Sequence, residues 1–147
     1  MTIKLSAKVT KHMEHFSEKC LEYCINNKVK LDIPANVHQD WEGIMGRCLD
    51  AKRHKIPKGS SLYMLFGSDG KPLYVGKSNN AYTRLRSHLV KNSSGTNSKF
   101  GEFVKYVDQG NPSIFFAVIA IKPKGINAFC EIYLQEKYSF SWVHRKG

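Results

Sequence analysis

A glycine-rich turn between two apolar runs is the sequence feature that most limits how this chain can fold. The turn, residues 67–72, reads Gly-Ser-Asp-Gly-Lys-Pro and separates residues 61–66 from residues 73–76. Short apolar runs joined by such a turn are typical of an antiparallel β-hairpin. The pattern therefore places Tyr63 and Tyr74 on neighbouring strands.

The hydrophobic spacing changes immediately after this hairpin. Ser78 or Asn79 can cap a helix from about residue 80 to residue 90, where apolar residues recur at helical spacing. Arg84 and His88 lie four positions apart, and residues at that spacing share one face of a helix. The sequence therefore predicts that a guanidinium and an imidazole lie together shortly after the two tyrosines.

Three further elements are predicted towards the C-terminus. The spacing of apolar residues at 100–107 indicates a short helix, and the continuous apolar run at 114–121 is typical of a strand inside a sheet. Residues 128–138 favour a last helix, which Asn127 can cap and which carries Glu131.

The N-terminal part reads as mainly helical. Apolar residues recur at helical spacing over residues 6–26 and, more weakly, over residues 41–49. Between them, residues 29–33 alternate apolar and polar side chains and are compatible with an extended segment. We therefore expect a helical extension over residues 1–58, packed on a core formed by residues 59–147.

These patterns together predict an α/β (α+β) fold. We expect a small, mainly antiparallel three-stranded sheet flanked by helices, with the N-terminal helical extension added to it. The chain has 147 residues, which is enough for one ordinary domain with a buried core.

The charge balance indicates a polyanionic partner. Lys and Arg total 23 against 12 for Asp and Glu, which gives a formal net charge of +11. A solvated basic surface without a specific partner is the alternative. The longest apolar run, residues 114–121, is too short to cross a membrane, and the N-terminus lacks the apolar stretch of a secretory signal. We therefore expect an intracellular, cytoplasmic protein.

The four cysteines form no close pair and are expected to be reduced thiols. His12, Cys20 and Cys24 fall on one side of the first predicted helix, a spacing compatible with a zinc site. The two cysteines also continue the apolar stripe of that helix, and no fourth ligand follows. The sequence therefore favours a core role for both.

The segment after the turn resembles the GIY-YIG nuclease family. Residues 74–76 read Tyr-Val-Gly, the family's tyrosine-apolar-glycine pattern, and Lys77, Arg84 and His88 follow at spacings that the family uses. Residues 61–63 read Ser-Leu-Tyr and keep only the tyrosine of the family's first triplet. The resemblance extends from about residue 60 to residue 147.

This resemblance implies a DNA endonuclease that hydrolyses phosphodiester bonds with the help of Mg²⁺ or Mn²⁺. Glu131 stands where the family has its metal-binding glutamate, with Glu136 as the alternative. The family's roles also make Tyr63 the base that activates water and Tyr74 a supporting donor. The implied catalytic residues are Tyr63, Tyr74, Lys77, Arg84, His88 and Glu131.

Other residues are expected to contact DNA or to support the site. The absence of a side chain at Gly76 allows a close approach of backbone and phosphate or neighbouring strand. Five lysines would extend a phosphate track, namely Lys91, Lys99, Lys105, Lys122 and Lys124. The family usually carries a late asparagine, but residues 142–144 read Trp-Val-His here. Asn127 or His144 would have to supply that polar group.

Three functions remain open at this point. The first is the Mg²⁺-dependent endonuclease, a restriction-like or phage-type enzyme, with a homodimer on DNA as one expected assembly. The second is a nucleic-acid-binding module that kept the fold but lost efficient chemistry. The third is a basic interaction protein whose tyrosines only fill the core.

Overall fold

The two apolar runs around the glycine-rich turn pair as the predicted hairpin in the computed structural model of the chain. The structure describes residues 7–32, 52, 54–89, 113–122 and 125–141. In the turn, the N–H of Gly67 donates to the carbonyl oxygen of Lys71 at 2.8 Å, and the N–H of Gly70 donates to that of Gly67 at 2.9 Å. Gly70 has a φ of 84°, a conformation that glycine adopts without a steric penalty. Local sequence therefore sets this turn.

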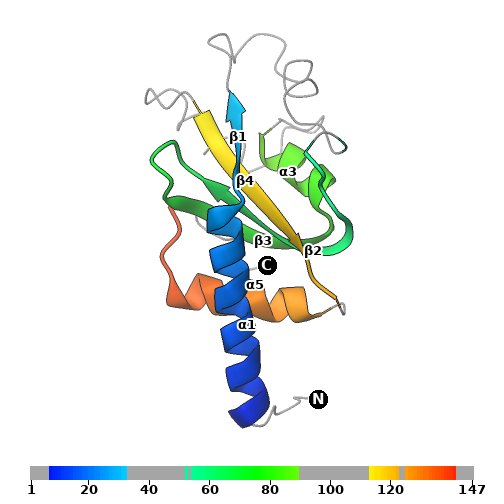
Figure 1. Ribbon diagram of the computed structural model, residues 1–147, viewed down its shortest axis with the longest axis vertical. Helices are drawn as coiled ribbons and strands as arrows, with labels where there is room; N and C mark the ends of the chain where they lie inside the picture. The colour runs from blue at the N-terminus through cyan, green and yellow to red at the C-terminus, as the bar shows by residue number, and fades with distance from the viewer. Residues whose placement is uncertain (1–6, 33–51, 53, 90–112, 123–124, 142–147) are drawn as a thin grey trace.

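The four described strands form one antiparallel sheet in the order β1-β4-β2-β3 (Figure 1). The elements are α1 (Ala7–Asn26), β1 (Val29–Asp32), β2 (Lys58–Phe66), β3 (Pro72–Asn80), α3 (Ala81–Leu89), β4 (Ser113–Ala120) and α5 (Ile126–Lys137). The predicted α+β class and antiparallel sheet are confirmed, and the sheet has one strand more than expected. The extra strand is β1, which pairs with β4 and buries Leu31 opposite Ile114.

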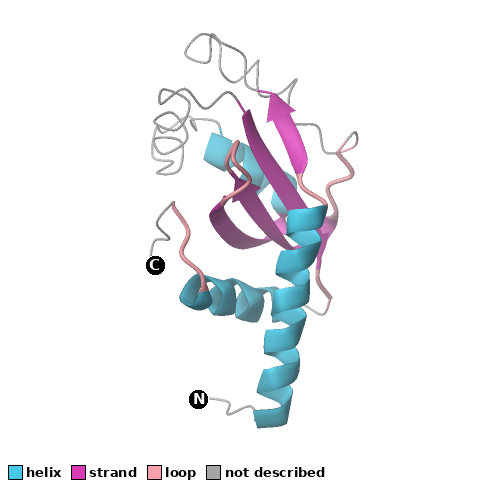
Figure 2. Ribbon diagram, turned by 60° about the vertical axis from the view of Figure 1, so that its left-hand side comes forward, coloured by secondary structure: helices cyan, strands magenta, loops and turns pink. Residues whose placement is uncertain are grey.

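Alternate residues of β2 face opposite sides of the sheet. Leu62, Met64 and Phe66 join an apolar cluster with residues of α1 and α5. Tyr63 and Leu65 face the other way and are equally buried. Helices α1 and α3 lie on opposite sides of the sheet (Figure 2). The two tyrosines of the hairpin therefore belong to the side that α3 covers.

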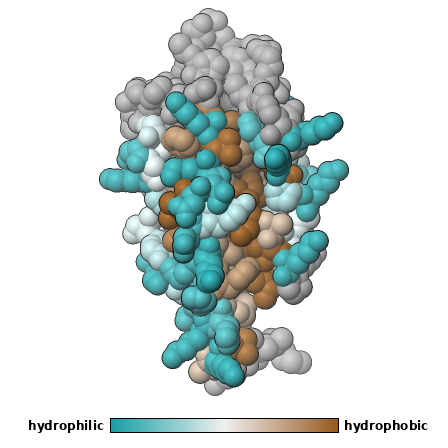
Figure 3. All heavy atoms as spheres, viewed as in Figure 1, coloured by the Kyte–Doolittle hydropathy of each residue, from teal (hydrophilic) through white to brown (hydrophobic). Residues whose placement is uncertain are grey.

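Helix α1 confirms only part of the predicted apolar stripe. Cys20 and Cys24 are buried, but Val9 is 43% exposed and Phe16 is 39% exposed. The N-terminal part of α1 runs past α5 and away from the sheet (Figure 1), which leaves these two side chains more exposed than the two cysteines. Hydrophilic side chains and a band of apolar residues share this face of the molecule (Figure 3).

The cysteines of α1 lie in the core, against α5. Cys20 and Cys24 pack in the apolar cluster with Cys130, and Oγ of Ser17 lies 3.2 Å from Sγ of Cys130. All three thiols are free, and burial raises the pKa of Cys24 to about 12. His12 is exposed instead. In the part of the chain that the structure describes, no three His, Cys, Asp or Glu side chains gather as a metal site would require, so the core role of the cysteines holds.

The expected domain boundary falls at the first residue of a strand, because β2 begins at Lys58. The described part of the N-terminal segment shares its core with the rest of the chain through α1 and β1. The helices predicted at residues 41–49 and 100–107 lie outside the described residues. None of the described helices combines the length and the apolar character that crossing a membrane requires.

Candidate active site

Helix α5 covers the outer edge of β3. Because β3 stands at one end of the sheet, its outward N–H and carbonyl groups have no neighbouring strand to bond. The backbone N–H of Lys77 donates instead to Oε2 of Glu131 at 2.6 Å. Nε2 of Gln135 lies 3.5 Å from the carbonyl oxygen of Val75, at the limit of a hydrogen bond. Glu131 and Gln135 are four positions apart and share one face of α5, so the strand edge fixes where the Glu131 carboxylate lies.

The surroundings of Glu131 favour an additional cation. Burial raises the pKa of Glu131 above its usual range, and the Lys77 N–H and the charges of Lys77 and Arg84 only partly offset this. A nearby positive charge stabilises a carboxylate that burial has stripped of part of its water. The alternative acid, Glu136, is exposed on the same helix. Glu131 is therefore the carboxylate that the structure places in a binding environment.

The same environment fits a hard divalent cation. Mg²⁺ binds proteins through one or two carboxylates and completes its shell with water and substrate phosphate oxygens. One half-buried carboxylate beside a strand edge meets this requirement, whereas a site made wholly of protein side chains would need several ligands. Such a cluster does not occur within the described ranges.

The two phenols lie together on the other side of β2 and β3. The ring centroids of Tyr63 and Tyr74 are 6.1 Å apart, and the rings are tilted by 33°. Their hydroxyl groups share a hydrogen bond, and the Arg84 guanidinium also bonds the hydroxyl of Tyr63. A planar, permanently charged guanidinium can hold a phenol oxygen and still present other N–H groups to a phosphate. Arg84 itself is exposed on α3, where a substrate can reach it.

The two tyrosines differ in burial and in how strongly their surroundings raise the pKa of the phenol. Burial raises the pKa of Tyr63 far above that of a free phenol, and the neighbouring Tyr74 raises it further, against the opposing effect of Arg84. The pKa of Tyr74 is also raised, first by burial and then by the negative charge of Glu131. Tyr63 is only 1% exposed and Tyr74 is 9% exposed. Tyr74 is therefore the phenol nearer to solvent.

Gly76 makes room for the ring of Tyr63. The two residues stand opposite each other in the β2–β3 pair. A Cβ atom at position 76 would lie 2.9 Å from Cε1 of Tyr63 and closer still to its Cζ and Oη. Real Cβ atoms do not approach other atoms that closely. The sequence predicted a close approach at this glycine, and the group that approaches is the tyrosine ring.

The predicted site residues fall into three groups. The structure brings together Tyr63, Tyr74, Lys77, Arg84 and Glu131 through the contacts described above. His88 lies on α3 one turn after Arg84, but its side chain is outside the described part. Lys122 is exposed directly after β4. Four lysines of the predicted phosphate track, Lys91, Lys99, Lys105 and Lys124, lie outside the described residues.

Two predicted helix caps are wrong. The cap of α3 is Asn80, whose Oδ1 accepts from the N–H of Thr83 at 3.1 Å, while Oγ of Ser78 accepts from the N–H of Asn80 at 2.9 Å. Helix α5 begins after Gly125, which has a φ of 101° and provides no side-chain cap. Asn127 is instead buried, and its Nδ2 donates to the carbonyl oxygen of Ser61 at 3.2 Å. This bond ties the start of α5 to β2 and so supports the position of Glu131. The other residue considered for the missing amide, His144, lies outside the described part.

Gln135 is a residue that the sequence analysis missed. Its contact with the edge of β3 supports the one made by Glu131. The spacing of four residues on a predicted helix was the available signal, because it places Gln135 on the same face as Glu131.

The residues of this site lie within a segment that matches a known family. Residues 60–145 match the family model described as the GIY-YIG catalytic domain, which confirms the resemblance found in the sequence. The chain is also similar to the UvrABC system protein C of Acidobacterium capsulatum, with 33% identity over 69 residues. That alignment covers 43% of this chain and 10% of the relative, so the chain spans a small part of the relative's length. No solved structure matches the chain significantly.

Proposed function

Because this chain belongs to the GIY-YIG family and is a nuclease of that type, we propose that it is a Mg²⁺-dependent endonuclease acting on DNA. The observation that carries the proposal is the convergence of one carboxylate, one guanidinium and two phenols beside the edge of β3. The formal net charge of +11 supports a polyanionic substrate. A DNA substrate is also compatible with the cytoplasmic location predicted from the sequence.

Glu131 would hold the metal. When bound there, Mg²⁺ would supply positive charge to the scissile phosphate. The chain itself fixes the position of the carboxylate. The Lys77 N–H donates to Oε2 at 2.6 Å, and this bond also restricts where Oε1 can point. A carboxylate held in this way loses little conformational entropy when a cation binds.

Arg84 and Lys77 would neutralise the phosphate as negative charge develops. Arg84 can bond two phosphate oxygens at once, whereas Lys77 provides a single ammonium charge. Both side chains are exposed beside Glu131, whose pKa their positive charges lower. Charges that are in place before the reaction stabilise its transition state without reorganisation.

We assign the proton-accepting role to Tyr74 rather than to Tyr63, which the sequence analysis favoured. A base must contact water, and Tyr74 is the more exposed phenol. Tyr63 has the more strongly disfavoured phenolate and lies between Arg84 and Tyr74 in the hydrogen-bond chain. In this assignment Tyr63 stays protonated and positions Tyr74, and the Tyr74 phenolate takes the proton of the attacking water.

Nicking of supercoiled plasmid DNA by the purified chain tests this proposal. We expect nicking with Mg²⁺ or Mn²⁺, no nicking in EDTA, and a loss of at least about 100-fold in rate for Arg84→Ala and Glu131→Ala. Arg86→Ala and Glu136→Ala are matched controls, because both residues are exposed on the same two helices and should retain activity. Equal losses in the controls would contradict the assigned roles.

A folded wild-type chain that nicks nothing across several divalent metals would refute the nuclease proposal and leave the DNA-binding module. A gel shift with salt titration would then separate the binding module from the basic interaction protein, which predicts no steep salt dependence. We also propose a homodimer on DNA, because two copies would supply one such site for each strand. Sedimentation with and without a DNA duplex measures that state.

A further inference from the structure

A cavity opens at the end of β3, and Glu131 is not among the described residues that line it. The cavity has a volume of about 740 Å³ and lies where the start of β2, the end of β3 and the first turn of α3 meet. This volume is typical of pockets that enclose a small organic group. None of the described residues that line it takes part in the chemistry proposed above.

Three of the described residues that line this pocket are lysines. Lys52, Lys55 and Lys58 line it, and among the described residues no carboxylate forms an ion pair with any of them. Lys55 has a φ of 53°, an unusual conformation for a residue other than glycine, and its N–H donates to the carbonyl oxygen of Lys52 at 3.2 Å. A turn therefore places Lys52 and Lys55 at the pocket, where Lys58 at the start of β2 adds a third positive charge, and such a group of charges attracts an anion.

The uncharged lining is suited to a planar ring. Tyr82, in the first turn of α3, is partly exposed at the pocket, and Ile56 and Pro57 provide an apolar wall. Asn79 and Asn80 add amide groups, although Oδ1 of Asn80 is used to cap α3. An aromatic ring beside lysines is the combination that binds unstacked bases and their phosphates.

The pocket lies beside a smaller cavity that reaches Lys77, at the end of β3. Asn79 lines both the pocket and this smaller cavity of about 150 Å³, which Lys77 also lines. A strand rises about 3.3 Å per residue, so Asn80 lies about 10 Å along β3 from the Lys77 amide that holds Glu131. A DNA strand advances about 3.4 Å per nucleotide along the helix axis, so this separation corresponds to about three nucleotides.

We propose that this pocket receives an unstacked nucleotide of the cleaved DNA strand, with its base against Tyr82 and its phosphates on Lys55 and Lys58. The inference rests on the proposed function, because DNA is taken as the substrate. It adds a preference to that function: DNA with an unpaired nucleotide within about three positions of the cut binds better than a perfect duplex.

Binding measurements in EDTA test the pocket without any cleavage. The probes are a fluorescein-labelled duplex with one unpaired nucleotide and the same duplex fully paired, measured by fluorescence anisotropy with the full chain. We expect the wild type to prefer the unpaired probe by about tenfold, and Tyr82→Ala to lose that preference, because stacking on an aromatic ring is sequence-tolerant and strong. Tyr82→Phe keeps the ring and should bind as the wild type does.

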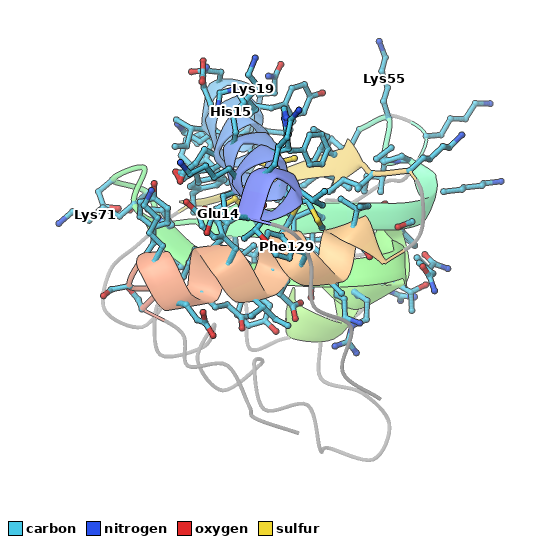
Figure 4. All side chains as sticks on the ribbon, turned by 90° about the horizontal axis from the view of Figure 1, so that it is seen from below. Glu14, His15, Lys19, Lys55, Lys71 and Phe129 are labelled. Atoms are coloured by element: carbon cyan, nitrogen blue, oxygen red, sulfur yellow. The ribbon has the colours of Figure 1, made fainter. Side chains whose placement is uncertain are left out.

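Lys55→Gly tests the charge without disturbing the turn. Glycine tolerates the positive φ at this position, so the variant should fold at least as well as the wild type, and its thermal melting checks this. We expect weaker binding by about three- to tenfold, and a salt dependence whose slope is lower by about 1. Lys71→Ala and Tyr23→Ala are matched controls. Both residues are exposed, and Lys71 projects from the opposite end of the structure to Lys55 (Figure 4).

Two results would overturn the pocket proposal. In the first, Tyr82→Ala and Lys55→Gly both bind DNA with the affinity and the preference of the wild type. In the second, the two control variants lose as much affinity as the pocket variants do. The proposed nuclease function fails separately, through an absence of nicking. A chain that binds the unpaired probe through Tyr82 but never cuts DNA supports the pocket and contradicts the nuclease. If the chain cuts DNA but its pocket variants bind as the wild type does, the nuclease proposal is supported and the pocket proposal is contradicted.

Discussion

Replacing Gly76 by alanine should disturb both the stability and the activity of this chain. The added Cβ would lie 2.9 Å from Cε1 of Tyr63 and nearer to Cζ and Oη, so the ring must move by several tenths of an ångström or more. Tyr63 is 1% exposed, and a well-packed core has little room for such a shift. Overpacking of this kind costs about 1–3 kcal/mol of unfolding free energy.

Urea denaturation measures this loss. With an m-value of about 2 kcal/mol/M, the midpoint should fall by about 0.5–1.5 M. The phenol of Tyr63 bonds both Arg84 and Tyr74, so its displacement should also move the two groups to which we assign catalytic roles. A shift of 1 Å in such groups lowers the rate by about 100-fold, which a nicking assay at equal protein concentration would show.

A double-mutant cycle identifies the cause. Tyr63→Leu removes the atoms that an alanine at position 76 would meet, so Gly76→Ala should cost much less stability in that background than in the wild type. The expected coupling is at least about 1 kcal/mol. Additive effects of the two substitutions, or a Gly76→Ala variant as stable as the wild type, would refute the steric argument.

Three other substitutions give measurable outcomes. Burial alone would raise the pKa of Glu18, but hydrogen bonds from Tyr138 and Lys137 and the charge of Lys137 together lower it below 4.5. Glu18→Gln should therefore cost about 1 kcal/mol above pH 4.5, and this difference from the wild type should vanish as the pH falls below that value, which melting curves across pH would show. If the Tyr74 phenolate is the base, its raised pKa means that the nicking rate should rise about tenfold per pH unit between pH 7 and pH 9. A flat profile, or the same slope in Tyr74→Phe, would contradict that role. Asn127→Ala removes the bond to Ser61 at 3.2 Å and should destabilise the fold by about 1–3 kcal/mol in urea titration, because it leaves a buried carbonyl without its donor; a change under 0.5 kcal/mol would count against it.

The hairpin and the main helices were accessible from the sequence because their signals are local. The turn at residues 67–72 and the apolar spacing of α1 each depend on residues a few positions apart. The family resemblance singled out Glu131 and Arg84, and the structure places both near the tyrosine pair. The exact helix caps were harder to predict. Ser78, Asn79 and Asn80 all have side chains that can cap a helix, and the sequence does not show which of them caps α3.

The contact that fixes Glu131 could not be predicted from local patterns. The carboxylate and the Lys77 amide are 54 positions apart in the chain, and the amide is available only because β3 lies at the end of the sheet. Strand order therefore had to be known first. The same reason applies to Asn127, whose amide reaches a strand carbonyl 66 positions away. Asparagine is a common helix cap, so the sequence favoured that role. The packing of α5 on β2 instead buries Asn127 and lets it bond the Ser61 carbonyl.

The contacts of Glu131 and Gln135 with β3 also affect how this protein behaves at high concentration. An uncovered strand edge is a template on which a second chain can add its own strand, and long uncovered edges promote aggregation. Along β3, the amide of Lys77 and the carbonyl of Val75 are occupied by side chains of α5. Helix α5, which carries the proposed metal-binding carboxylate, thus also hinders neighbouring molecules from joining their sheets at this position.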